Sequence, residues 1–263
     1  MAGVATETDE YARPRGKGIY LLPNLLTTAC LFSGFYAVVA AIDKHFHFAG
    51  IAIFFAMVFD TLDGRIARLT RTESAFGKEY DSLADMLSFG VAPAIVAYQW
   101  GVVRIAEYGR HWGRFGWLAC FFYVAAAALR LARFNARAAS ADKRYFEGLP
   151  SPSAAAIVAA FVWFVSDWHE PGLTGLICAF VLTASAGALM VSRFGYPSFK
   201  QFDLDRRIRF VYMVLVPIAF LLIAVDPPTM LLAMFGTYAL SAPLLWVGRR
   251  LRRLVRGAPA PSG

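Results

Sequence analysis

Charged residues are scarce in this sequence. Asp, Glu, Lys and Arg make up 17% of the 263 residues, whereas hydrophobic residues make up 58% and the mean hydropathy is +0.52. An ordinary soluble domain has about 25% charged residues. This chain is too apolar for a water-facing surface, and it is also too apolar to remain disordered. The composition therefore favours a protein that lies in a lipid bilayer.

Cysteine is rare as well. The three cysteines, Cys30, Cys120 and Cys178, lie in separate apolar runs. An odd number at such spacing indicates neither a disulfide framework nor a CxxC metal site, so we expect small buried side chains. The N-terminus lacks an apolar run followed by a small-residue cleavage site, and no signal peptide is expected.

Long apolar runs dominate the rest of the sequence. A helix needs roughly 20 residues to cross about 30 Å of hydrocarbon, and eight runs are candidates. We expect an all-α polytopic membrane protein with a polar, disordered segment at 1–18, one transmembrane domain at 19–248 and a basic tail at 249–263. The fifth and seventh runs are short, so six full spans are an alternative to eight. The expected spans are approximately 21–42, 46–66, 82–103, 115–136, 152–168, 173–192, 208–225 and 229–248.

Lysine and arginine gather on one side of this eight-span arrangement. Of 26 such residues, the other side holds only Lys44, Arg104, Arg110 and Arg114. Positive loops stay in the cytoplasm, so we expect both termini there and an even number of spans. The net charge of +8 lies next to membrane segments, where anionic headgroups attract it. We therefore expect membrane lipids, and not nucleic acid, as its partners.

Four aspartates lie where two expected spans meet the cytoplasm. Asp60 and Asp63 end the second span, and Asp81 and Asp85 begin the third. Carboxylates at membrane depth are costly and mark functional sites. At about 100° per residue, each pair shares one helix face, and Ser88 extends the second face. A short loop makes the two helices antiparallel neighbours, so we expect the four carboxylates to converge.

Converging carboxylates repel one another unless cations compensate them. An all-oxygen set without nearby His or Cys favours Mg²⁺ or Mn²⁺ over zinc, and four carboxylates suffice for two ions. Gly64 and Ala67 leave room for a bulky ligand on the acidic face, and Arg68 beside it offers a cation for phosphate. The alternative is that the aspartates only pair with neighbouring arginines for packing.

The spacing D-x2-D-G-x2-A-R-x8-G-x3-D-x3-D resembles the signature of the CDP-alcohol phosphotransferase family. These enzymes join a CDP-activated group to an alcohol and release CMP. The resemblance implies a homodimer with a six-helix core, two divalent cations held by the four aspartates, and Asp85 as general base. It also implies contacts between the CDP diphosphate and Asn24 and Thr27 of a PNLLT stretch. The signature positions are Asp60, Asp63, Gly64, Ala67, Arg68, Gly77, Asp81 and Asp85. Of these, Asp63, Gly64, Ala67, Arg68 and Gly77 are also expected at the diphosphate.

Three further stretches resemble the phosphatidylserine synthase branch of that family. They are LSFGVAPA at 87–94, ALRLARFN at 128–135 and FEGLPSPSAA at 146–155. With them the resemblance covers about residues 20–190 and implies CDP-diacylglycerol and L-serine as substrates. Arginine can hold a carboxylate through two parallel hydrogen bonds, although it also anchors helix ends by snorkelling. The candidate serine-binding residues are Arg130, Arg133, Asn135 and Ser151.

Several functions compete at this point. The nearest alternative is the same transfer to glycerol 3-phosphate or inositol phosphate. A divalent-cation transporter would also use aspartates, but an ion path gains nothing from the spacing of Gly64, Ala67 and Arg68. A structural scaffold leaves four costly carboxylates unexplained. We expect an enzyme of the cytoplasmic membrane whose active site faces the cytoplasm and which acts by direct displacement.

Overall fold

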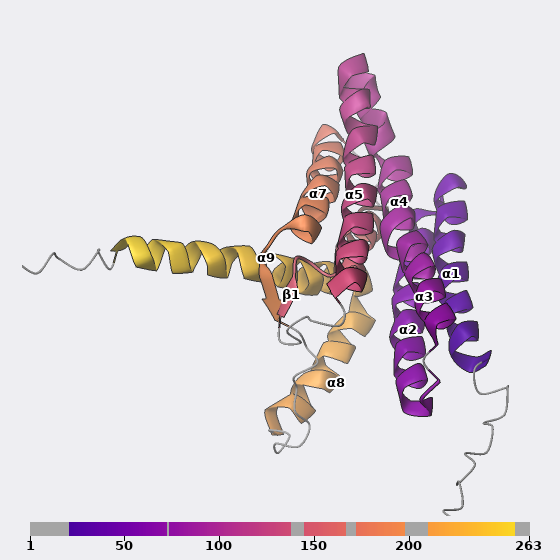
Figure 1. Cartoon of the computed structure of the whole chain (residues 1–263). Helices are drawn as coiled ribbons and strands as arrows, with labels where there is room; N and C mark the ends of the chain where they lie inside the picture. The colour runs from indigo at the N-terminus through magenta and orange to yellow at the C-terminus, as the bar shows by residue number, and fades with distance from the viewer. Residues whose placement is uncertain (1–20, 73, 138–144, 167–171, 198–209, 256–263) are drawn as a thin grey trace, which may run out of the picture.

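The computed structural model describes residues 21–72, 74–137, 145–166, 172–197 and 210–255, which are almost entirely helical (Figure 1). A small antiparallel sheet pairs β1 (Tyr145–Glu147) with β2 (Gly195–Pro197) and so joins the loops that follow α5 and α7. The helices are α1 (Leu21–Ile42), α2 (Phe46–Thr70), α3 (Ala75–Asp85), the π-helix η2 (Met86–Val91), α4 (Ala92–Trp100), the 3₁₀ helix η3 (Val102–Tyr108), α5 (Arg110–Arg137), α6 (Ser151–Ser166), α7 (Leu173–Val191), α8 (Phe210–Val225) and α9 (Pro227–Val255).

The segments from α1 to α7 form a bundle. The helix α1 packs along α2, α5 packs along α7, and α6 contacts α2, α4 and α7. Among the described residues, six helical segments are long and apolar enough to cross a membrane, whereas α6 has 16 residues and is shorter than that. An all-α polytopic membrane protein is therefore confirmed. The count of eight spans and the cytoplasmic placement of both termini stay predictions.

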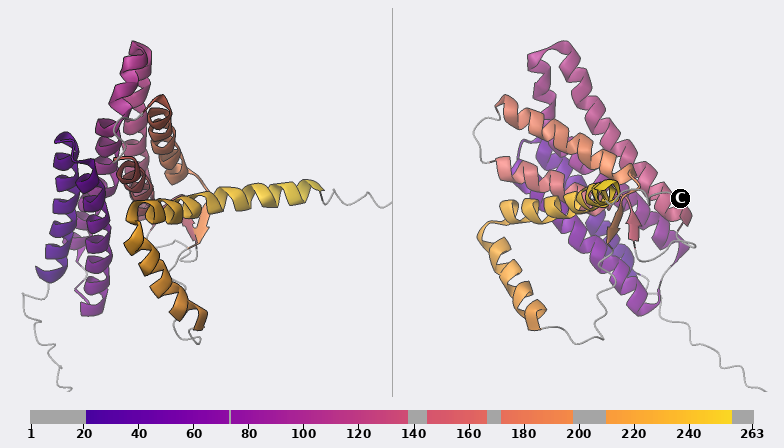
Figure 2. Two further views of the ribbon diagram at one scale, coloured as in Figure 1. Left: turned by 180° about the vertical axis from the view of Figure 1, so that it is seen from behind. Right: turned by 90° about the vertical axis from the view of Figure 1, so that its left-hand side faces the viewer.

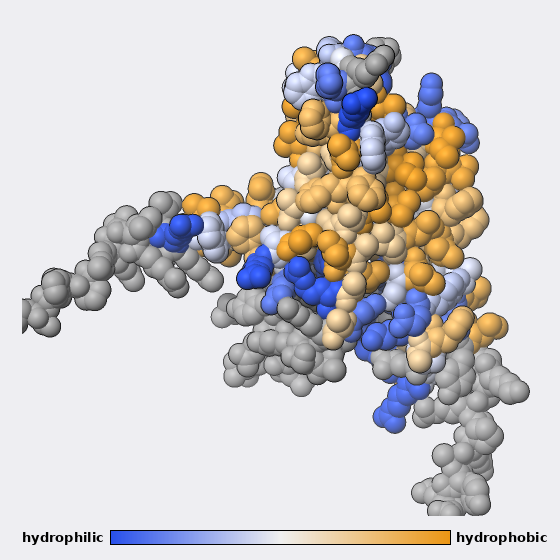
Figure 3. Space-filling model, turned by 45° about the horizontal axis from the view of Figure 1, so that its top comes forward, coloured by the Kyte–Doolittle hydropathy of each residue, from blue (hydrophilic) through white to orange (hydrophobic). Residues whose placement is uncertain are grey.

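The outer surface of the bundle is apolar. Large side chains such as Phe32 on α1 and Phe121 on α5 are more than half exposed, at 67% and 59%. In Figure 3, hydrophobic residues cover the middle of the visible face of the bundle, and hydrophilic residues gather toward its ends. An apolar surface of this extent is typical of contact with lipid or with another protein chain.

The third span begins earlier than expected. The sequence placed its start at 82, but the helix already begins at Ala75, and the continuous apolar segment runs over 75–108. The reason is a cap: the side chain of Ser74 accepts a hydrogen bond from the backbone N–H of Gly77. Such a cap satisfies a free donor at a helix start and lets a polar first turn form outside the hydrophobic run.

The helices α8 and α9 are oriented differently from the helices of the bundle. In both Figure 1 and Figure 2, α9 runs crosswise to the bundle and projects away from it. It contacts α6, and the Tyr196 hydroxyl of β2 donates to the Ala239 carbonyl at 2.9 Å. The helix continues to Val255, beyond the domain end expected at 248. The expected polar segment 1–18 and the tail from 256 onward lie outside the described residues.

Candidate functional site

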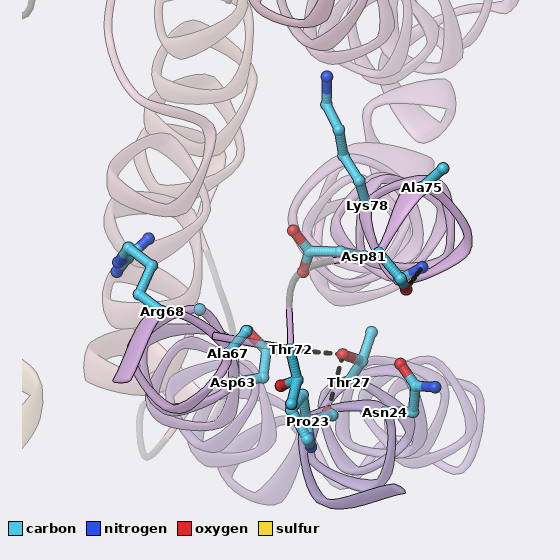
Figure 4. A pocket seen from close by; sticks show the side chains of 13 residues that line it. Pro23, Asn24, Thr27, Asp63, Ala67, Arg68, Thr72, Ala75, Lys78 and Asp81 are labelled. Carbon is cyan, nitrogen blue, oxygen red and sulfur yellow. Dashed lines mark hydrogen bonds between the residues drawn. The ribbon is translucent and has the colours of Figure 1, made fainter. Parts of the chain in front are cut away.

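A pocket of about 460 Å³ opens where α1, α2 and α3 meet (Figure 4). The helix α2 ends beside it because Arg71 adopts a left-handed conformation with φ 53°, which ends many helices. The capped first turn of α3 begins three residues later. The lining residues are Pro23, Asn24, Thr27, Asp63, Gly64, Ala67, Arg68, Thr72, Ser74, Ala75, Gly77, Lys78 and Asp81. All seven positions expected at the CDP diphosphate are among them.

Three of the four aspartates form a compact oxygen cluster at this pocket. One carboxylate oxygen each from Asp60, Asp63 and Asp81 lies within 4.8 Å of the others. The Thr27 hydroxyl of α1 donates to Asp63 Oδ2 at 2.8 Å and so fixes that carboxylate. The expected convergence of α2 and α3 is thus seen, and α1 supports both helices. An all-oxygen cluster of this size is the donor set that Mg²⁺ and Mn²⁺ prefer.

Asp85 lies next to this cluster. Its carboxyl group interacts electrostatically with that of Asp60, and its Oδ1 atom is buried without a hydrogen-bond partner among the described residues. Asp60 therefore connects Asp85 with Asp63 and Asp81. A buried carboxyl oxygen left without a partner costs free energy, so this atom has unused capacity for a cation or for a substrate proton.

The start of α3 forms the opposite wall of the pocket. Backbone N–H groups at a helix start attract anions such as phosphate. A Cβ atom on Gly77 would lie 3.0 Å from Ser74 Oγ and 3.5 Å from Asn24 Oδ1, so a side chain there would crowd the capping hydroxyl. Gly64 faces open space, because a Cβ there would approach nothing nearer than the Arg68 guanidinium at 3.6 Å.

The sequence analysis missed three polar residues that line this pocket, namely Thr72, Ser74 and Lys78. Ser74 could have been found, because a serine directly before a helical pattern is a capping signal. The Lys78 side chain extends away from the aspartates (Figure 4), and no residue pattern along a single helix predicts the placement of Thr72.

Arg130 of α5 and Ser151 of α6 are hydrogen-bonded to each other. The Arg130 Nη1 group donates to Ser151 Oγ at 2.8 Å, and Arg130 interacts electrostatically with Asp85. The Arg130 Nε group is buried and has no hydrogen-bond partner among the described residues. An unpartnered guanidinium N–H that lies near an unpartnered carboxyl oxygen is suited to a small ligand with both a donor and an acceptor.

Backbone hydrogen bonds hold Ser151 at the start of α6. Gly148 has φ +79° and donates to the Phe194 carbonyl at 2.9 Å, and Leu149 donates to the Leu189 carbonyl at 3.0 Å. Together with the β1–β2 pairing, these bonds tie the loop before α6 to the end of α7. They fix the position of the Ser151 side chain relative to α5.

The other two candidates for serine binding lie elsewhere. Arg133 Nη1 is 3.5 Å from the Val191 carbonyl at the end of α7. Asn135 Nδ2 donates to Ser82 Oγ on α3 at 3.0 Å. Of the four residues expected at the acceptor, the structure therefore brings together only Arg130 and Ser151.

Comparison with known proteins agrees with this geometry. Residues 20–192 match the model of the family described as CDP-alcohol phosphatidyltransferase. The chain belongs to this family. The resemblance carried by the aspartate spacing is confirmed, and the family region covers the bundle from α1 to α7 and excludes α8 and α9.

Several curated relatives have names that specify a reaction. A CDP-diacylglycerol–serine O-phosphatidyltransferase of Helicobacter pylori is 35% identical over 87% of this chain and 92% of its own length. The enzyme of the same name from Saccharomyces cerevisiae is 39% identical over 51% of this chain and 50% of its own. An archaetidylserine synthase of Methanothermobacter thermautotrophicus is 34% identical over 67% of this chain and 69% of its own.

Proposed function

We propose that this protein transfers the phosphatidyl group of CDP-diacylglycerol to the hydroxyl of L-serine and releases phosphatidylserine and CMP. The observation that carries this proposal is an aspartate cluster beside a phosphate-sized pocket, together with Asp85 and a buried Arg130 that interact electrostatically. The names of the relatives from bacteria, yeast and archaea agree on serine as the acceptor.

The pocket between α1, α2 and α3 binds the CDP end of the donor. The start of α3 and the Arg68 guanidinium offer N–H groups to the diphosphate. Asn24 and Thr27 form the α1 wall, and Gly64, Ala67 and Gly77 leave room for the phosphates. The acyl chains lie in the cytoplasmic leaflet, since the exposed surface of these helices is apolar.

Two divalent cations, Mg²⁺ or Mn²⁺, fit the aspartate cluster. Asp60, Asp63 and Asp81 supply oxygens within 4.8 Å of one another, and the free Oδ1 atom of Asp85 adds a fourth donor. When bound, the cations neutralise charge that develops on the diphosphate. Thr27 holds Asp63 in place for this role.

Serine fits the space between Asp85 and Arg130. Its carboxylate pairs with the Arg130 guanidinium, which Ser151 orients, and its hydroxyl faces Asp85. Asp85 accepts the hydroxyl proton, the serine oxygen forms a bond to the phosphorus that bears diacylglycerol, and the bond from that phosphorus to CMP breaks. A phosphorylated alcohol would bring two further negative charges and would need more cations than Arg130 alone provides here.

We favour direct displacement over a phosphatidyl-enzyme intermediate. A covalent aspartyl intermediate needs a freely reachable carboxylate, and we expect each aspartate to bind metal or to be positioned to accept a proton. No Ser–His or Cys–His pair could serve instead, because the described residues around the pocket contain neither His nor Cys. Serine and the CDP-lipid then bind together. Labelled CMP is therefore expected not to exchange into CDP-diacylglycerol in serine-free protein. Rapid exchange would indicate a covalent intermediate.

One assay tests the substrate assignment. Purified protein is incubated with CDP-diacylglycerol, Mn²⁺ or Mg²⁺ and one alcohol from a panel of L-serine, glycerol 3-phosphate and inositol phosphate, and CMP is measured. We expect release that depends on serine and stops with a chelator. Release with another alcohol would reassign the acceptor, and metal uptake into vesicles without CMP release would favour a transporter.

The remaining expectations concern the setting of the enzyme. We propose that it lies in the cytoplasmic membrane with its pocket toward the cytoplasm, because the positive loops neighbour the pocket. We also propose a homodimer, as the family resemblance implies. Cross-linking of the protein in native membranes tests this proposal, because a homodimer should yield a covalently linked dimer.

A further inference from the structure

The helix that carries Asp81 and Asp85 changes its geometry directly after Asp85. A regular α-helix through Asp81, Asp85 and Ser88 was expected, but residues Met86–Val91 form the π-helix η2. The backbone N–H of Ala92 bonds to the Leu87 carbonyl, five residues back. π-Helical turns are rare and are frequent at functional sites, so this one needs a local cause.

Pro93 supplies that cause. In a regular α-helix the N–H of residue 93 would bond to the carbonyl of Phe89, but proline has no N–H and its ring collides with that carbonyl. The extra residue of a π turn relieves the collision. The Phe89 carbonyl is then left without its usual helical donor in a residue that is fully buried.

Tyr123 of α5 takes over the missing bond. Its hydroxyl donates to the Phe89 carbonyl at 3.0 Å, and its side chain is completely buried. Buried backbone carbonyls are almost always paired, and the Tyr123 hydroxyl is the side-chain donor seen here. The bond therefore ties η2 to α5 at one defined depth.

The helix α1 holds η2 from the other side. The Ser88 hydroxyl donates to the Cys30 carbonyl at 3.1 Å. A Cβ atom on Gly34 would lie 2.7 Å from Ser88 Cα, so the two backbones touch. On the α5 side, a Cβ on Gly90 would lie 3.3 Å from the Ala127 Cβ. The segment η2 is thus clamped between two helices immediately after Asp85.

We propose that Tyr123 is a positioning residue that sets the place of Asp85 through η2. This inference rests on the proposed role of Asp85 as the base. Asp60 and Asp63 belong to α2, and Asp63 is fixed by Thr27 of α1, whereas Asp85 adjoins η2 directly. A shift of η2 therefore moves Asp85 relative to the oxygen cluster. A misplacement of about 1 Å can cost a hundredfold in rate.

The variant Tyr123→Phe removes only the hydroxyl. We expect kcat for phosphatidylserine formation to fall about tenfold or more, while KM for CDP-diacylglycerol stays within about twofold of wild type. The reason is that the pocket and the Asp60–Asp63–Asp81 cluster are built by α1, α2 and α3. Tyr36→Phe, on an exposed tyrosine of α1, is the matched control and keeps wild-type kinetics.

A second variant tests the same clamp through a different hydrogen bond, so that the proposal can still be judged if Tyr123→Phe does not fold. Ser88→Ala removes the bond to α1 and is expected to lower kcat with the same unchanged KM. Wild-type kcat in Tyr123→Phe would overturn the proposal. So would a fall in kcat accompanied by an equal rise in KM for CDP-diacylglycerol, because that pattern indicates general loosening of the fold.

Hydrogen–deuterium exchange separates this inference from the proposed function. If Tyr123 holds η2, exchange at residues 86–92 rises in Tyr123→Phe and not in Tyr36→Phe. Unchanged exchange overturns the clamp even in an active enzyme. If the wild type releases no CMP with serine, the proposed function fails instead, and the exchange result still reports whether Tyr123 holds η2.

Discussion

At the scale of the residue, the chemistry depends on oxygen atoms that meet at helix ends. Asp60, Asp63 and Asp81 converge although each carries a charge that the bilayer disfavours. Such a cluster is maintained only if a ligand compensates the charges. Removing one carboxylate should therefore affect turnover much more than folding.

Replacing any one of the four aspartates by asparagine keeps the size and removes the charge. We expect Asp60→Asn, Asp63→Asn, Asp81→Asn and Asp85→Asn each to lower kcat by more than about a hundredfold, the scale of one strong transition-state contact. Glu79→Gln, on an exposed carboxylate of α3 outside the pocket, is the control and should remain active. CMP release in detergent micelles measures each rate. Near-normal activity in two of the four variants would contradict the two-metal site.

Gly64 tests the pocket independently of the metals. A Cβ on Gly64 meets nothing closer than 3.6 Å, so Gly64→Ala should fold and bind the donor. Gly64→Leu extends a branched side chain into the space assigned to the diphosphate, and we expect binding of CDP-diacylglycerol to be lost with little change in thermal stability. Equilibrium binding of the labelled donor distinguishes the two variants. Normal binding by Gly64→Leu would place the nucleotide elsewhere.

Residue spacing predicted the aspartate pocket better than it predicted the serine-binding residues. The aspartates, Gly64, Ala67 and Arg68 follow from the 3.6-residue period, since it fixes which side chains share a face. The same period says nothing about which neighbouring helix a face meets. Arg130 and Arg133 are three residues apart, yet one contacts Ser151 on α6 and the other reaches the end of α7.

At the scale of the element, loops and helix irregularities set the positions of these residues. Pro93 indicates an irregularity in this helix, but local sequence does not identify the donor to the Phe89 carbonyl, because that donor, Tyr123, lies 34 residues away. The start of the third span was predicted too late in the sequence for another reason. Hydropathy marks where a helix enters the bilayer, whereas the Ser74 cap marks where the helix begins.

Gly148 provides a test at this scale. Its φ of +79° disfavours any side chain, and a Cβ would lie 3.0 Å from the Ser192 carbonyl oxygen. Left-handed backbone costs other residues roughly 1–2 kcal/mol. We expect Gly148→Ala to lower the thermal midpoint and to raise KM for serine, because the loop that places Ser151 shifts. Gly236→Ala, where a Cβ meets nothing within 4 Å, should change neither quantity. An unaltered KM for serine would indicate that Ser151 does not contribute to the acceptor site.

At the scale of the whole molecule, the bundle that matches the family contains the site, whereas the two helices that follow it do not. The region 20–192 that matches the family holds the pocket and both groups of polar residues. The helices α8 and α9 lie beyond it, and α9 runs crosswise to the bundle (Figure 2). Their hydrophobic runs were predictable from composition. Their direction was not, because it depends on contacts such as those of α9 with α6 and β2.

The sidedness of the membrane protein is the last prediction. If positive loops are cytoplasmic, Asp43 before α2 and Glu107 before α5 lie outside, and Arg65 near the pocket lies inside. All three side chains are exposed. In a Cys178→Ser background, which removes the exposed native thiol, we expect Asp43→Cys and Glu107→Cys to react in intact cells with a membrane-impermeant maleimide. Arg65→Cys should react only after permeabilisation. The reverse pattern would place the aspartate pocket outside, away from cytoplasmic serine and CDP-lipid, and would contradict the proposed setting of the enzyme.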